Sequence, residues 1–237
     1  MPLGARYVQE TTVFREFGPV SGNTVMFGYE FAPPVGAFLS RQTVDLDARY
    51  YLRIAETGVL ALRGHAFKSW GEFPDFTFFG GNSEMRGYDY LQFLGHKAFF
   101  GNAELRFPLV EAMLTPIGVI GGIRGTFFFN FGMAGLAGQP MNAWTSTPVV
   151  VRPVAGYRYS NVTQSNEQVF GDPVKVTGFR LNNARASYGI GLTTMAIGFP
   201  IHFDWAWLTL FNRQWEDVIF ATEAVGELVG AFVGELL

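Results

Sequence analysis

The sequence of 237 residues contains no cysteine and few charged residues. The absence of cysteine excludes disulfides, thiolate chemistry and cysteine-based zinc sites. Charged residues make up 16% of the chain, whereas soluble globular proteins usually carry about 25%. The chain is therefore short of charge for a surface that faces water.

Long hydrophobic runs are also missing. No stretch of roughly 20 apolar residues without charge occurs, which argues against an ordinary transmembrane helix. Yet 49% of the residues are hydrophobic. A chain can be apolar outside without a long apolar run when its strands show lipid at every second residue, as in a membrane β-barrel. The 25 Phe, 9 Tyr, 5 Trp and 29 Gly suit lipid faces, aromatic girdles and a crowded interior.

The net charge of −3 predicts no nucleic-acid partner. The first ten residues, "MPLGARYVQE", lack the charged and then apolar pattern of a signal segment. Since an outer-membrane protein is made with such a segment, we expect the chain to be a mature or truncated product.

Alternation is clearest in residues 43–54, "TVDLDARYYLRI". The even positions from Val44 to Ile54 are apolar, whereas Asp45, Asp47, Arg49 and Arg53 stand among the odd positions. This period of two is close in length to the roughly 9–11 residues that cross a bilayer as a tilted strand. We expect the charges to point into a wet lumen and the apolar row to face lipid.

Similar alternation recurs elsewhere. Odd positions are apolar in 23–31, 103–107, 127–133 and 201–207, and weaker patterns lie at 5–14, 58–68 and 185–194. A soluble β-sandwich also alternates, but its exposed face would be nearly empty of lysine, and runs such as "TFFFNF" would be aggregation hazards in water. The pattern predicts eight antiparallel transmembrane strands, with a ninth candidate at 217–225.

The expected connections alternate in length, as in a barrel with tight turns at one end and long loops at the other. The short ones are 15–22, 54–57, 110–122 and 196–200; the long ones are 33–42, 69–99, 134–184 and 208–216. We interpret 134–184 as a long outer loop, with room for a small hairpin around Val149–Tyr159. A second domain at 134–184 is the alternative to a single barrel domain over 1–237.

The order of motifs after residue 78 is specific. "FFGGNSEMRGYDYLQFLG" is followed by "GNAELRFPL" and then by "GTFFFNFG". This series resembles the C-terminal β-barrel of the outer-membrane assembly superfamily, of the BamA and TamA type, also called the bacterial surface antigen family. It is particularly similar to the barrels that follow TolB-like propellers.

The resemblance implies a loop that folds back into the lumen and is held there by an Arg-Gly-Tyr signature. Carried over residue by residue, the signature is Arg86, Gly87 and Tyr88, and its first acidic partner is Glu104. Asn130 stands where the family usually has aspartate. The adjacent glycines Gly80 and Gly81 permit the tight backbone where the loop doubles back. The alternative is a solvated loop arginine with an unrelated lumen carboxylate.

The end of the chain departs from the family. Residues 217–237 show apolar pairs every four residues, which is closer to a helix than to the usual closing strand. The family barrel has sixteen strands, so the chain corresponds to the C-terminal portion of a larger barrel, or it closes alone or with a partner.

Other chemistry finds little support. His65, His96 and His202 have no partner at metal-ligand spacing, and no hydrolase, phosphate-loop or dinucleotide motif occurs. We expect no enzyme activity, no metal and no cofactor. The resemblance implies insertion or translocation of polypeptides at the bacterial outer membrane, with lipid, nascent outer-membrane or secreted polypeptides and other envelope subunits as partners. The alternatives are a structural or anchoring barrel in an envelope complex and a small passive pore.

Overall fold

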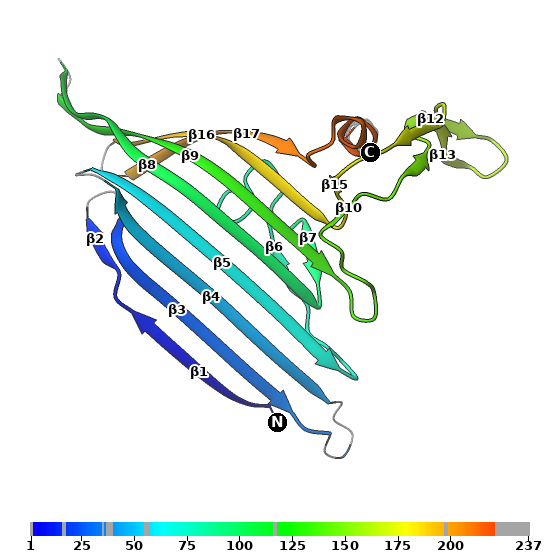
Figure 1. Ribbon diagram of the computed structural model, residues 1–237, viewed down its shortest axis with the longest axis horizontal. Coiled ribbons are helices and arrows are strands. Elements are labelled where there is room, and N and C mark those ends of the chain that lie inside the picture. The colour runs from blue at the N-terminus through cyan, green and yellow to red at the C-terminus, as the bar shows by residue number, and fades with distance from the viewer. Residues whose placement is uncertain are drawn as a thin grey trace. The chain divides into compact units, whose positions relative to one another are not determined.

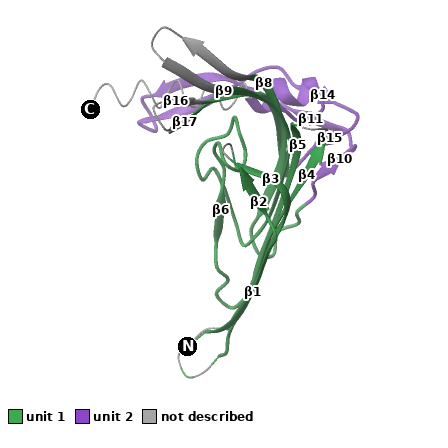
Figure 2. Cartoon of the chain, turned by 90° about the vertical axis from the view of Figure 1, so that its left-hand side faces the viewer, with its two compact units in different colours: residues 1–141, 183–208 green, residues 142–182, 209–237 purple. Residues whose placement is uncertain are grey.

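The computed structural model describes residues 2–15, 18–34, 36, 40–54, 57–115, 118–196 and 199–220. Its contacts divide the chain into two compact units. The first contains residues 1–141 and 183–208, and the second contains residues 142–182 and 209–237 (Figure 2). The expectation of one barrel domain over 1–237 stays a prediction.

The first unit is built on one large antiparallel sheet (Figure 1). Its strands run in the order β1-β3-β4-β5-β8-β9-β16-β17, and the short β2 pairs with β3. Their bounds are β1 Leu3–Glu10, β2 Val13–Arg15, β3 Gly18–Ala32, β4 Arg41–Ile54, β5 Gly58–Gly71, β8 Lys97–Thr115, β9 Gly118–Gly135, β16 Ala184–Ala196 and β17 Phe199–Thr209. The prediction of an all-β antiparallel fold with eight main strands is confirmed.

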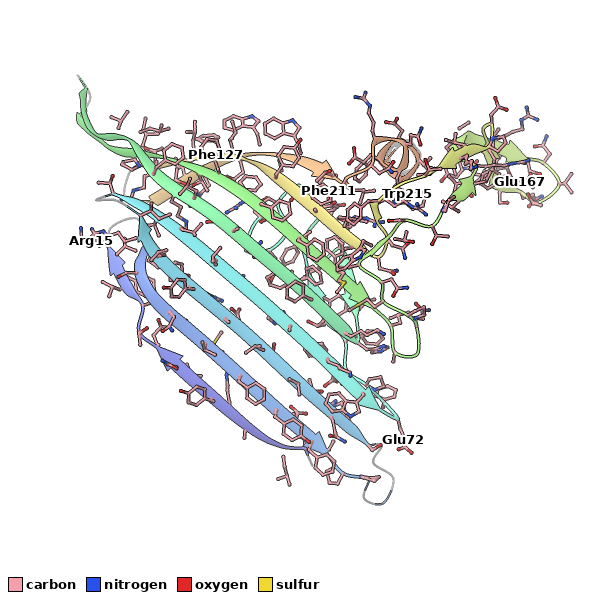
Figure 3. All side chains as sticks on the ribbon, viewed as in Figure 1. Arg15, Glu72, Phe127, Glu167, Phe211 and Trp215 are labelled. Carbon is pink, nitrogen blue, oxygen red and sulfur yellow. The ribbon has the colours of Figure 1, made fainter. Side chains whose placement is uncertain are left out.

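The register brings the predicted apolar rows onto one face. Phe27 lies opposite Leu46, and Leu105 lies opposite Phe127. We call this the aromatic face; many of its side chains are at least one-third exposed, among them Phe27, Tyr50, Leu105, Phe127, Phe129, Phe203, Trp205 and Trp207. The opposite, polar face carries Asp47, Arg63, Glu104, Asn130 and Asp204. Side chains project from both faces of the strands (Figure 3).

One connection and one strand differ from the sequence prediction. The expected gap at 110–122 is mostly strand, since β8 continues to Thr115 and β9 begins at Gly118. The pairing simply resumes beyond an irregularity between Pro108 and Val110. Backbone hydrogen bonds hold this extension, and they do not require an alternating side-chain pattern. The expected strand 5–14 is instead divided into β1 and β2.

The second unit contains three two-stranded pairings. β10 (Trp144–Thr145) pairs with β15 (Arg180–Leu181), and β11 (Val149–Val151) pairs with β14 (Val174–Val176). The hairpin lies between β12 (Val154–Ser160) and β13 (Ser165–Phe170). The hairpin expected around Val149–Tyr159 therefore lies later in the sequence, because the chain reverses only after Ser160.

The chain after β17 is helical rather than extended. Residues 213–220 form a helix, on which Trp215 is labelled in Figure 3. Asn212 caps its first turn by accepting a hydrogen bond from the backbone N–H of Trp215 through Oδ1 at 3.2 Å. The candidate closing strand at 217–225 is therefore wrong over 217–220, and the rest of 217–237 lies outside the described residues.

Candidate functional site: a loop anchored on the polar face

The segment between β5 and β8 folds over the polar face of the sheet. It contains a small hairpin of β6 (Thr77–Phe79) and β7 (Phe93–Gly95). Figure 2 shows the part that carries β6 on one side of the sheet. We call residues 72–96 the inward loop.

Apolar side chains attach this loop to the sheet. Phe79, Met85 and Tyr88 form a buried cluster with Ala98 and Phe100 of β8. The rings of Phe79 and Phe100 stack with centroids 5.1 Å apart, and Met85 is fully buried. Burying a side chain of this size contributes about 1.5–3 kcal/mol. The loop therefore has its own core, made with β8.

Glycines allow the loop to turn sharply. Gly80, Gly81 and Gly87 have φ values of 143°, 78° and 88°, which other residues rarely adopt. The N–H of Gly80 donates to Glu84 Oε2 at 2.8 Å. A Cβ on Gly87 would lie 2.9 Å from both Ala206 Cβ and Leu208 Cδ2. Gly87 thus provides both the backbone conformation and the close approach to β17.

Arg86 extends from the loop to two strands of the sheet. Its Nη2 lies 2.6 Å from Glu104 Oε1 on β8, and its Nε lies 3.2 Å from Asp204 Oδ2 on β17. The guanidinium also lies over the ring of Phe128, 4.5 Å from the centroid. The side chain is only 16% exposed, so a planar cation is held between two carboxylates and an aromatic ring.

Glu104 receives a second cation. Arg106 donates to Glu104 Oε2 through Nη2 at 2.6 Å and through Nε at 2.8 Å. The two oxygens of Glu104 are therefore shared between two arginines, one from the loop and one from its own strand. Because charge-assisted hydrogen bonds hold both oxygens, the carboxylate is fixed in orientation.

Small residues leave room for these contacts. A Cβ on Gly191 would overlap Asp204 Oδ1, and a Cβ on Gly189 would overlap the ring of Phe128. Both glycines belong to β16, which lies between the strands that carry Phe128 and Asp204. The two glycines of β16 therefore leave the space that Phe128 and Asp204 need to contact Arg86.

Asn130 takes part in a different contact from the one its position suggested. It is completely buried, and its Oδ1 accepts from Asn102 Nδ2 at 2.8 Å while its Nδ2 donates to Ser187 Oγ at 3.0 Å. Asn102 also donates to the backbone oxygen of Glu84 in the loop. Asn130, which stands where the family usually has aspartate, therefore joins the loop to the sheet indirectly, through Asn102.

Tyr88 anchors the loop at a further point. Its hydroxyl donates to the backbone oxygen of Ala186 on β16 at 3.1 Å, and its side chain is buried. The structure thus brings Arg86, Tyr88 and Glu104 into one region of the polar face, and it adds Asp204 in the place expected for Asn130. The alternation of residues 201–207 placed Asp204 on the lumen face, which was the available signal.

A second ionic group lies beside the loop. Asp47 accepts from Arg49 and from Arg63, with Nη2 of Arg63 at 2.7 Å. Arg63 also lies over the ring of Phe100, 4.9 Å from the centroid, and donates to the backbone oxygen of Ser83 at 3.4 Å. These contacts fit an ion-pair network better than a catalytic acid–base pair, since both carboxylate oxygens of Asp47 accept hydrogen bonds from arginine.

The histidines occupy separate places. His65 Nε2 lies 2.8 Å from Asp45 Oδ1, His202 Nδ1 lies 2.9 Å from Thr193 Oγ1, and His96 Nδ1 accepts from the N–H of Ala137 at 2.9 Å. Within the described part of the chain, no group of three or more His, Asp or Glu side chains is arranged to hold a metal ion.

An antiparallel sheet with an exposed aromatic face, a charged opposite face and a loop folded over the latter is the architecture of an outer-membrane β-protein. Residues 12–220 match the Omp85 superfamily domain, and the chain belongs to this superfamily. Its members act in the assembly and translocation of proteins at outer membranes. No curated protein matches the chain in sequence. None of the described helical residues form a helix long and apolar enough to cross a membrane.

Proposed function

We propose that this chain inserts or translocates polypeptides at the bacterial outer membrane, with the inward loop as the element that changes position. The observation that carries the proposal is the double contact of Arg86 with Glu104 and Asp204. One side chain of the loop thereby reaches both β8, in the interior of the sheet, and β17, the last strand in the described order.

This arrangement supports a coupled movement of loop and edge. When Arg86 stays between its two carboxylates, the loop covers the polar face and β17 is held beside it. When Arg86 leaves, Glu104 keeps Arg106 as a partner. The carboxylate of Glu104 therefore stays paired after the loop has moved away from β8. A two-state contact of this kind allows a passing polypeptide to displace the loop at limited cost.

The aromatic face supports the membrane location. Its large apolar side chains are exposed, with Phe127 at 54% and Trp207 at 50%, whereas the polar face buries Asp47, Asn130 and Ser187. In water such a surface would associate with other apolar surfaces. In a bilayer it contacts acyl chains, and the charged face meets water.

The proposal is tested by reconstituting the chain in lipid vesicles and adding an unfolded outer-membrane β-barrel client. We expect faster appearance of protease-protected client than with empty vesicles, and a slower rate with Arg86→Ala. Arg53→Ala is the control, because Arg53 is exposed at the end of β4. Equal rates with and without the wild-type chain would contradict the proposal.

Electrical recording distinguishes the proposed function from that of a passive pore. A lumen that holds the inward loop conducts little and flickers, whereas an open pore conducts steadily. A large steady conductance of the wild-type protein, unchanged in Arg86→Ala, would favour the pore.

A further inference from the structure

One turn of the inward loop is held through its backbone. Arg63 Nη1 donates to the backbone oxygen of Ser83 at 3.4 Å, and Asn102 Nδ2 donates to the backbone oxygen of Glu84. Arg63 and Asn102 lie directly opposite each other on β5 and β8. Since every residue of a polypeptide carries such a carbonyl group, this pair of donors suits a chain of any sequence.

The sheet itself holds both donors in position. Asp47 accepts from Nε and Nη2 of Arg63, the latter at 2.7 Å, and the guanidinium lies over the ring of Phe100. Asn102 Nδ2 also donates to Oδ1 of the buried Asn130 at 2.8 Å. Both donors therefore keep their orientation when the loop departs, and a donor that is already oriented binds a new acceptor with little further loss of conformational freedom.

The loop satisfies the side-chain amide of Asn102 only in part. The Oδ1 atom of Asn102 is buried and accepts no hydrogen bond from the described residues. The N–H of Glu84 does not serve it, because that group donates to the backbone oxygen of Gly81 at 3.2 Å. A residue in an extended chain differs from this turn, since its own N–H and C=O point in the same direction. Such a residue would bond to both Nδ2 and Oδ1 of Asn102.

Space for another chain lies on both sides of Arg63. A cavity of about 620 Å³ between the sheet and the loop has Arg63 and Glu84 in its lining. A second cavity, of about 160 Å³, is lined in part by Arg63, Ser83 and Asn102. A polypeptide that displaces the turn would therefore pass from one cavity to the other across both donors.

We propose that Arg63 and Asn102 form a binding site for the backbone of an extended polypeptide, which the loop occupies through Ser83 and Glu84 until a client chain replaces it. The inference rests on the proposed function and names what the polar face recognises: the main-chain amide groups of an unfolded chain. Replacement is favoured because the 3.4 Å contact at Ser83 is long for a hydrogen bond, and because the client also donates to Asn102.

The test measures binding separately from insertion. Tyr51→Cys places a single cysteine at the 160 Å³ cavity, and Arg86→Ala loosens the loop in the same chain. The probe is an unstructured glycine–serine peptide with one activated cysteine, and its rate of disulfide formation with the protein in vesicles reports binding. Each rate is divided by that of a small methanethiosulfonate reagent, so that changes in thiol reactivity cancel.

Removing both donors should weaken binding of the peptide. We expect Arg63→Leu with Asn102→Leu to lower the normalised rate roughly tenfold, as expected for the loss of two hydrogen bonds. Arg53→Gln is the matched control, because Arg53 is exposed at the end of β4, and it should leave the rate unchanged.

Changes in the peptide test the same contacts without altering the site. A peptide of the same sequence with an N-methylated backbone lacks the N–H groups that would donate to Asn102 Oδ1, so it should react more slowly. A threonine–glutamine peptide should react as fast as the glycine–serine peptide. This comparison decides the question if the double variant does not fold.

Three results would overturn the inference: an unchanged rate in the double variant, equal rates for the two backbones, or a rate that follows the side chains of the peptide. Insertion of a client without any reaction of the peptide would also overturn it, and would leave the proposed function standing. Reaction of the peptide as expected, without insertion of a client, would contradict the proposed function alone.

Discussion

Arg86 and Asp204 join the inward loop to the last strand of the sheet, with Nε of the arginine 3.2 Å from Oδ2 of the aspartate. The two residues lie far apart in the sequence, and no local pattern connects them. Together with the 2.6 Å contact to Glu104, this contact makes Arg86 an ionic link between the loop and two strands of the sheet.

Arg86→Ala is expected to destabilise the folded protein by about 3 kcal/mol or less, since loss of one partner of a buried ion pair typically costs about 3–5 kcal/mol and Glu104 keeps Arg106 as a second partner. The free energy of unfolding is measured with denaturant in detergent or lipid, and limited proteolysis reports cleavage within 72–96. Arg53→Ala should leave both unchanged. The double variant Arg86→Ala, Glu104→Ala should be less than additive; strict additivity would show that the two side chains act independently.

Gly87→Ala should loosen the loop for two reasons. Alanine is strained at a φ of 88°, and its Cβ would press against Ala206 and Leu208. Gly138→Ala is the matched control, because Gly138 has a φ of 78° and a Cβ added there would meet no atom within 4 Å. We expect protease cleavage of the inward loop to increase only in Gly87→Ala. Unchanged cleavage of the inward loop in Gly87→Ala would contradict this role of Gly87.

Asn130→Ala should lower stability by about 1–3 kcal/mol, because it leaves buried hydrogen-bonding groups of Asn102 and Ser187 without their partner. Asn161→Ala, at an exposed position in the β12–β13 turn, should have little effect. Thermal unfolding followed by circular dichroism gives both values. A neutral Asn130→Ala would mean that neighbouring groups rearrange to replace the amide.

The aromatic face is tested by labelling. Cysteine at Phe129 or Leu46 should react with a membrane-confined reagent and resist an aqueous one, whereas cysteine at Asp45, on the polar face and 57% exposed, should react in the opposite way. Phe129→Arg should cost about 2–4 kcal/mol if the position lies near the bilayer midplane. The reverse labelling pattern would exclude a lipid-facing aromatic surface.

The strands could be predicted from the sequence because each face of the sheet meets one environment. Period-two alternation located β4 around Asp45 and Asp47 and also fixed which side each residue faces. The extension of β8 and β9 toward Thr115 and Gly118 could not be read in this way. The hydrogen bonds of this extension join backbone groups, so they do not require an alternating pattern of side chains.

The site was only partly predictable for a related reason. Alternation placed Glu104 and Asp204 on the polar face, but the partner of a loop residue depends on how far the loop folds over the sheet. Asn130 illustrates the difficulty: an amide both donates and accepts, so Asn102 and Ser187 satisfy it as well as an arginine would. Apolar content alone did not separate the helix at 213–220 from a strand, and the cap at Asn212 favours the helix.

The position of Arg86 has a mechanical consequence. β8 and β17 are separated by β9 and β16, so a side chain that contacts both acts as a tie across the inside of a curved surface. Such a tie limits how far the four strands can flatten. Withdrawal of the loop and a change in the curvature of the sheet are then coupled, and a force on β17 reaches the loop through the Arg86 guanidinium and through the packing of Gly87 against Ala206 and Leu208.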